Sequence, residues 1–240
     1  MSGHSKWSTI KRQKGVTDAK RSASFTRVAN FVALVAREGG GDPNTNYRLK
    51  IAIEQARSVN MPKENIERAI KRGTGELGGA QIESAMYEVY GPGGVGFLIE
   101  AATDNKNRTI SDLKQVLNKN GGKQASSGSV QFLFLQKGRI IATYDKDTES
   151  GELAIIESEA DDYSNDEHTF FIYTKPTELT KIKLNLEERN FVVEEAQLVW
   201  EPNDTIKITD PNDIAKIEKL NDALEELDDA TGVYHNGEIE

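Results

Sequence analysis

The chain has 240 residues, of which 37% are apolar and 29% charged, with a formal net charge of −9 and no cysteine. Its composition is typical of folded globular domains, and its length predicts two or three of them. The lack of cysteine excludes disulfides, thiolate nucleophiles and Cys-based zinc sites. We find no apolar run long enough for a bilayer and no signal-peptide core near Met1, so we expect a cytoplasmic protein without a membrane partner.

The charge is segregated along the chain. Residues 1–79 hold 15 Lys and Arg against 7 Asp and Glu, whereas residues 80–240 hold 15 against 32. Because association depends on local potential, a basic region can bind a polyanion even on an acidic protein. Residues 1–79 are therefore expected to carry the function.

The first 17 residues are a basic arm without any acidic residue. Cationic side chains neutralise phosphates, and flat rings stack on unpaired bases. The arm offers both kinds of group: His4, Lys6, Trp7, Lys11, Arg12 and Lys14. It therefore predicts contact with nucleic acid; the alternative is a basic terminus without a ligand, with Trp7 packed on its own domain.

Apolar residues at helical spacing predict three amphipathic helices, at 18–38, 46–60 and 62–73. The second carries a mixed outer face of Lys50, Glu54 and Arg57. The first and third are expected to expose cations that can bind nucleic acid: Lys20, Arg21, Arg27, Arg68, Lys71 and Arg72. Glycines between positions 73 and 80 predict a linker, so the first domain is placed at 1–79.

Beyond the linker the apolar period changes to two, which is typical of strands. We expect a hairpin at 83–90 and 95–102, a helix at 109–120 started by a capping box of Thr109 and Asp112, and a strand at 129–135.

The next segment predicts a complete βαββαβ unit. Its expected elements are strands at 139–144, 158–163, 169–174 and 191–200 and helices at 151–157 and 177–189. The elements at 83–135 do not complete such a unit by themselves. We expect the missing elements after the βαββαβ unit, as a strand at 206–208, a helix at 211–227 and a strand at 230–235. The predicted fold class is α+β: a three-helix domain and two ferredoxin-like domains, the third (137–203) inserted into the second (80–136 and 204–240).

Gly91, Gly93 and Gly96 form a GxGxxG pattern, which is a dinucleotide-binding fingerprint when a helix follows it. Here a strand follows, so the pattern favours a hairpin turn and no cofactor is expected.

No catalytic or metal site is expected either. His4, His168 and His235 are far apart, and none lies at metal or triad spacing. The acids between positions 145 and 167 match no calcium loop and predict a solvated face. We therefore expect a protein that is not an enzyme and has no small-molecule substrate.

Residues 103–109, with the sequence TDNKNRT, lie at a predicted turn from strand to helix. There Lys106, Asn107 and Arg108 can meet a phosphate or a base together with the helix N-terminus. Asn and Asp are also the usual residues of turns and caps. The sequence is compatible with both interpretations.

Several motifs resemble the YebC/PmpR family, in one order along nearly the whole chain. They are GHSKW at 3–7, DAKR at 18–21, GGGDP at 39–43, NMPKENIERAI at 60–70, KRGTG at 71–75, YGPGG at 90–94, TDNKNRT at 103–109, GSV at 128–130 and VYHN at 233–236. The resemblance implies a helical N-terminal domain followed by two α+β domains, the last inserted into the middle one.

The resemblance also implies regulation of gene expression through a nucleic acid. Bacterial members are commonly described as DNA-binding transcriptional regulators acting at promoters. The mitochondrial relatives, among them an activator of cytochrome c oxidase translation, are translational activators, and some bacterial members are regarded as ribosome-associated factors for difficult sequences such as proline runs. We favour rRNA and the ribosome as partner, because a Lys, Trp and His arm suits irregular RNA and no recognition helix is evident.

Overall fold

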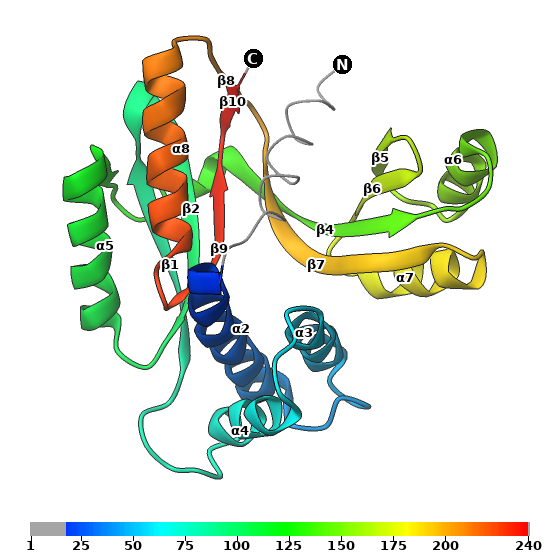
Figure 1. Ribbon diagram of the computed structural model, residues 1–240, viewed down its shortest axis with the longest axis horizontal. Coiled ribbons are helices and arrows are strands. Elements are labelled where there is room, and N and C mark those ends of the chain that lie inside the picture. The colour runs from blue at the N-terminus through cyan, green and yellow to red at the C-terminus, as the bar shows by residue number, and fades with distance from the viewer. Residues whose placement is uncertain (1–17, 240) are drawn as a thin grey trace. The chain divides into compact units, whose positions relative to one another are not determined.

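The computed structural model describes residues 18–239, with side chains from Phe25 onward. The described chain forms two compact units (Figure 1). One unit is Leu135–Glu201, and the other contains the segments up to Phe134 and from Pro202. The protein is of the α+β class, with a helical N-terminal part and antiparallel sheets.

The three predicted helices are present as α2 (Asp18–Gly39), α3 (Tyr47–Ser58) and α4 (Lys63–Gly73). Their apolar stripes form one core, which includes Val32, Leu49 and Ile66. Buried Asn46 caps α3 by accepting a hydrogen bond from the backbone of Leu49 at 3.1 Å, and it donates one to the carbonyl of Val35 at 2.9 Å. The turn after α2 is thereby fixed.

The same unit contains a four-stranded sheet. Its strands are β1 (Glu83–Tyr90), β2 (Gly96–Thr103), β3 (Lys123–Gln124) and β9 (Ala230–His235), in the order β3-β1-β2-β9. The hairpin of β1 and β2 is confirmed. Its turn, Pro92–Gly94, places Gly93 and Gly94 at φ of 66° and 78°, which glycine adopts at little cost.

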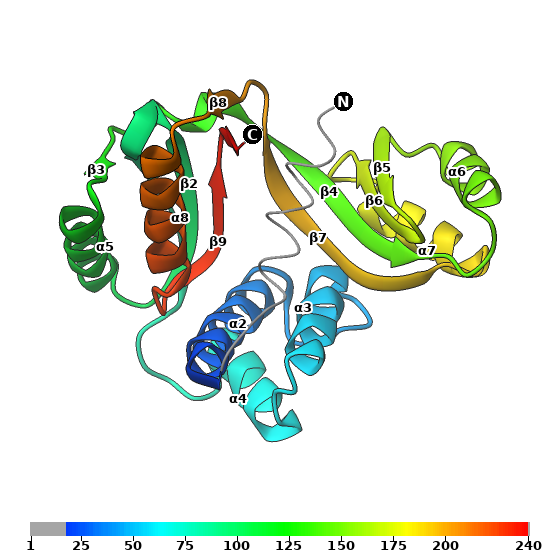
Figure 2. The ribbon, with the colours of Figure 1, turned by 45° about the horizontal axis from the view of Figure 1, so that its top comes forward.

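Helices α5 (Lys106–Asn120) and α8 (Pro211–Glu225) cover one face of this sheet, where Phe97 and Leu220 lie in the main core. Helix α2 lies beside β2 and β9 (Figures 1 and 2), and its Ala33 and Leu34 are packed with Ile82 and Ala102. The helical part therefore shares a hydrophobic interface with the sheet.

This sheet begins with a hairpin, so its connectivity differs from the βαββαβ order expected for a ferredoxin-like domain. Strand β8 (Ile206–Ile208) does not join the sheet but pairs in parallel with β10 (Gly237–Ile239), a strand that the sequence did not predict.

The unit Leu135–Glu201 contains the second sheet and two helices. Its elements in chain order are β4 (Phe134–Thr143), α6 (Thr148–Glu157), β5 (Asp162–Asp166), β6 (Thr169–Thr174), α7 (Leu179–Glu188) and β7 (Val192–Pro202). The strand order is β5-β6-β4-β7, as in a ferredoxin-like βαββαβ unit. Phe170, Ile155 and Leu186 are buried, and the rings of Tyr144 and Phe191 stack at 4.4 Å.

Two sequence predictions near the first sheet are wrong. Helix α5 begins at Lys106 and is capped by Asn105, whose side chain accepts a hydrogen bond from the backbone of Arg108 at 3.1 Å; Thr109 is a buried residue inside the helix. The strand expected at 129–135 is replaced by a 3-10 turn at Gln131–Leu133, after which β4 begins.

The carboxylate of Glu88 explains the missing strand. This side chain is buried, and it accepts hydrogen bonds from the backbone N–H groups of Gly128, Val130 and Gln131. Burial by itself raises the pKa of Glu88, but these backbone hydrogen bonds lower it below its ordinary value on balance. A segment whose N–H groups point to one carboxylate cannot form a regular strand ladder.

We expect Glu88→Gln to lower the free energy of unfolding by about 2–3 kcal/mol, because the amide offers one acceptor oxygen and turns an NH₂ group toward N–H donors. Since the folded-state pKa of Glu88 is lowered, its contribution is present above the unfolded pKa of about 4.3 and is lost as the pH falls through the folded value. Urea unfolding at pH 7 and at a series of pH values below about 4.3 measures both effects. Exposed Glu226, replaced by Gln, is the control, and equal unfolding of the two variants at pH 7 would contradict the assignment.

Candidate nucleic-acid interface

Many of the predicted binding residues lie at the start of the chain. His4, Lys6, Trp7, Lys11, Arg12 and Lys14 lie outside the described residues. Lys20 and Arg21 belong to α2, and their side chains are not described either. These eight remain predictions from the sequence.

Helix α4 presents two of the predicted cations to solvent. Arg68 and Lys71 are exposed, and neither forms an ion pair with the described part of the chain. Lys63, at the beginning of the helix, lies 3.7 Å from Glu67. The outer surface of α4 is therefore accessible but carries both signs of charge.

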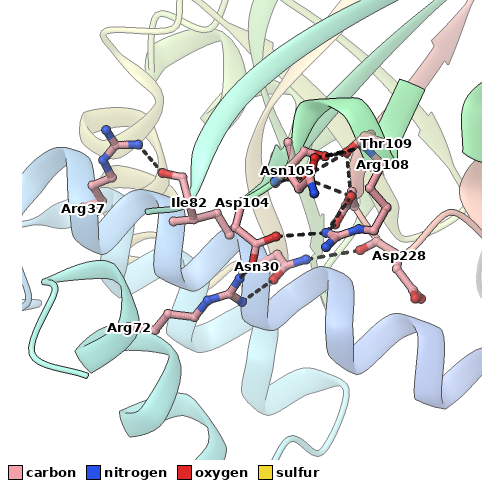
Figure 3. A network of polar contacts seen from close by, with 11 residues as sticks. Asn30, Arg37, Arg72, Ile82, Asp104, Asn105, Arg108, Thr109 and Asp228 are labelled. Carbon is pink, nitrogen blue, oxygen red and sulfur yellow. Dashed lines mark hydrogen bonds and ion pairs between the residues drawn. The ribbon is translucent and has the colours of Figure 1, made fainter. Parts of the chain in front are cut away.

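Arg72, at the end of α4, is not exposed as expected but half-buried in a polar network (Figure 3). Its guanidinium donates to Oδ2 of Asp104 at 2.6 Å and to Oδ1 of Asn30 at 2.8 Å. Buried Asn30 of α2 also donates to the backbone carbonyl of Asp228 at 3.4 Å. Arg72 thus joins α4, α2 and the turn after β2.

Arg108 occupies the other side of Asp104 (Figure 3). Its Nη2 lies 3.1 Å from Oδ1 of Asp104 and 3.1 Å from Oδ1 of Asp229. The hydrogen bond to Asp229 and, more weakly, the interaction with Asp104 raise the pKa of Arg108. A phosphate that bound Arg72 or Arg108 fully would have to displace a carboxylate.

Asp229 is the buried centre of this network. Its Oδ2 accepts hydrogen bonds from Thr103 at 3.0 Å and from Thr109 at 2.6 Å, and both hydroxyl groups are buried. A further link between the helical part and the sheet is the hydrogen bond from Arg37 to the carbonyl of Ile82. The network therefore holds α2 and α4 against the first sheet.

The remaining predicted residues differ in their accessibility. Lys106 forms an ion pair of 2.7 Å with Glu83, while Asn107 is exposed in the first turn of α5. Arg27 is only partly exposed: burial lowers its pKa, and the nearby carboxylates of Glu225 and Asp228 oppose that effect. Arg27 is therefore less available to a phosphate than the sequence suggested.

A polar cleft of about 230 Å³ lies at the network, lined from α2, α4, α5 and the segment before β9. Its lining includes Thr26, Asn30, Arg72 and Arg108 together with Asp112, Asp228 and Asp229. With three carboxylates and two guanidinium groups, the cleft is not an anion site. Sequence reasoning missed Asn30 and Asp229, because no local pattern marks them, and it placed Asp104 only in the turn at 103–109.

Two family models match nearly the whole chain. The TACO1/YebC protein N-terminal domain matches residues 5–76, and the TACO1/YebC second and third domain matches residues 82–237. The chain belongs to the TACO1/YebC family. The break between the two matches falls in the glycine-rich segment predicted as a linker, and the resemblance found in the sequence motifs is confirmed.

Relatives in this family are similar over their full length. A probable transcriptional regulatory protein of Thermoanaerobacter pseudethanolicus is 46% identical, covering 100% of this chain and 98% of the relative. Another of that name, from Persephonella marina, is 47% identical, with 100% and 96% covered. The crystal structure of a conserved hypothetical protein of Aquifex aeolicus is 44% identical with a TM-score of 0.86, covering 93% of this chain and 92% of that one.

Within residues 18–239, which the structure describes, no helix is long and apolar enough to cross a membrane. Nor do residues within that part of the chain bring together three His, Asp or Glu side chains that could hold a metal ion.

Proposed function

We propose that this TACO1/YebC protein is a non-enzymatic regulator of gene expression that binds ribosomal RNA and assists translation through difficult sequences such as proline runs. The observation that carries the proposal is the mixed charge of the two exposed helices, α3 and α4. It disfavours docking in a DNA groove and leaves the arm, with its rings and cations, as the main binding element.

Helix α3 illustrates the argument. Lys50, Glu54 and Arg57 are exposed and are spaced by four and three residues, so they share one side of the helix. A helix in the major groove lies between two phosphate backbones, and it reads base edges mainly with cationic and amide side chains, since a carboxylate can only accept hydrogen bonds, as it does from cytosine. The carboxylate of Glu54 at the middle of this side opposes that mode of binding.

Helix α4 shows the same alternation, since exposed Glu64 and Glu67 lie beside Arg68 and Lys71. Irregular RNA accepts such a surface more readily, because isolated cations can reach phosphates while unpaired bases stack on the rings of Trp7 and His4. We place the RNA contact at the arm together with Arg68 and Lys71.

The second candidate is a DNA-binding transcriptional regulator. It is favoured by the name of the relatives, which are called probable transcriptional regulatory proteins. A regulator of this kind would bind promoter duplex DNA selectively.

Sedimentation of the full chain with purified ribosomes at moderate salt separates the two candidates. We expect the chain to sediment with ribosomes. A variant in which six cations are replaced by Ala should no longer do so: Lys6, Lys11, Arg12, Lys14, Arg68 and Lys71. The control replaces Lys114 and Lys119, two exposed cations of α5, and should still sediment with ribosomes. A chain that stays unbound and shifts promoter duplex selectively would establish the transcriptional candidate instead.

A further inference from the structure

The unit Leu135–Glu201 is strongly acidic, with sixteen Asp and Glu against seven Lys and Arg. Five of the seven cations are held in ion pairs within the unit: Arg139–Glu195, Lys175–Glu178, Lys181–Glu159, Lys183–Glu187 and Arg189–Glu157. A sixth, Lys137, lies 5.8 Å from the ring centroid of Tyr173. The charge that this surface offers to a partner is therefore negative.

Large apolar side chains are exposed on the same unit. On α6, Leu153 and Ile156 are 57% and 61% exposed, although Gly151 and Ile155 already supply the buried side of the helix. Leu184 of α7 is 44% exposed. Single exposed apolar residues are common, but neighbouring ones mark contact surfaces.

Two ion pairs place these helices side by side. Glu157 at the end of α6 lies 2.5 Å from Arg189 after α7, and Glu159 lies 3.0 Å from Lys181 of α7. Leu184 is three residues from Lys181 and therefore lies on the same side of α7.

On each helix an exposed carboxylate lies beside the exposed apolar side chains. Glu149 precedes Leu153 by four residues on α6, and Glu188 follows Leu184 by four on α7; both are exposed and form no ion pair within the described residues. We call the surface of Glu149, Leu153, Ile156, Leu184 and Glu188 the α6/α7 face.

We propose that the α6/α7 face binds a basic protein segment, in which Lys or Arg side chains flank an apolar residue. The carboxylates repel phosphates and attract cations, while the exposed Leu and Ile side chains gain by contact with an apolar group. A second copy of this chain would bring two acidic surfaces together, which opposes self-association through this face.

The inference rests on the proposed function in one respect: the ribosome supplies the partner, since it presents basic proteins beside RNA. The arm and α4 then bind RNA, and the α6/α7 face binds protein. The experiment distinguishes this protein partner from two others, a nucleic acid and a second copy of this chain.

The first measurement places a benzophenone amino acid at position 153 or, as control, at position 114 on α5, and irradiates the full chain with purified ribosomes. We expect position 153 to cross-link to a ribosomal protein with an isoelectric point above about 9. The yield should fall about tenfold with Glu149→Lys and Ile156→Ser, and stay unchanged with Glu226→Lys at the C-cap of α8. Cross-links to RNA or to a second copy would overturn the proposal.

A second measurement does not depend on the ribosome. Fluorescence anisotropy follows a labelled synthetic peptide of alternating Lys and Leu binding to the full chain. We expect about tenfold weaker binding when Leu153 and Ile156 are both changed to Ser, and no change when Lys114 and Lys119 are changed. Equal affinity of the Ser variant would reject the α6/α7 face, even if the chain fails to bind ribosomes.

Discussion

Replacing Asp229 by Ala is expected to lower the free energy of unfolding by about 3–5 kcal/mol, because the change leaves a buried network without its acceptor. Thr103 and Thr109 would lose the carboxylate that accepts their hydrogen bonds, and Arg108 would lose one of its two partners. Urea unfolding of the full chain, followed by circular dichroism, measures the effect.

The neighbouring residue provides a matched control for Asp229. Asp228 is exposed, and its carboxylate forms no hydrogen bond in the network: its backbone carbonyl accepts the hydrogen bond from Asn30, while the carboxylate acts on Arg27 only through its charge. Asp228→Ala should therefore change the free energy of unfolding by about 0.5 kcal/mol or less. Similar losses in the two variants would show that the buried carboxylate is not the centre of the network.

Replacing the four arm cations Lys6, Lys11, Arg12 and Lys14 by Ala is expected to weaken RNA binding about 100-fold at near-physiological salt. Each lost phosphate contact removes roughly 0.7 from the slope of log affinity against log salt on single strands, so the slope should flatten by about 2.8. Filter binding of a single-stranded rRNA fragment, repeated over a series of salt concentrations, measures both quantities.

The control for this series removes Lys114 and Lys119 from α5, both exposed cations outside the proposed interface. Its salt slope should equal that of the unchanged chain. If the arm variant also keeps the original slope, the arm does not contact phosphates, and the RNA-binding proposal loses its main element.

The periodic elements of this protein could be predicted from sequence because each one reports its own buried side. The stripe of Val28, Val32 and Val35 places α2. Strand β1 is marked instead by the glycine-rich turn that follows it, because Tyr87, Glu88 and Val89 are all buried and no alternation reports its buried side. The helical part, the hairpin and the βαββαβ unit follow from such local patterns. The ends of the helices are less predictable. Asn105 and Thr109 are both suitable N-cap residues for α5, and only the folded helix shows that Asn105 is the N-cap.

Family membership, the segregation of charge and the positions of the cations can all be found in the amino-acid sequence alone. Which of these cations remain available to a partner depends on the fold. Arg72 meets Asp104 across 32 positions, and Arg108 meets Asp229 across 121. Glu88 likewise binds the backbone of a segment 40 or more positions away. Local periodicity reports whether a side chain faces the core, but an ion-pair partner is set by the packing of distant segments, which no local pattern contains.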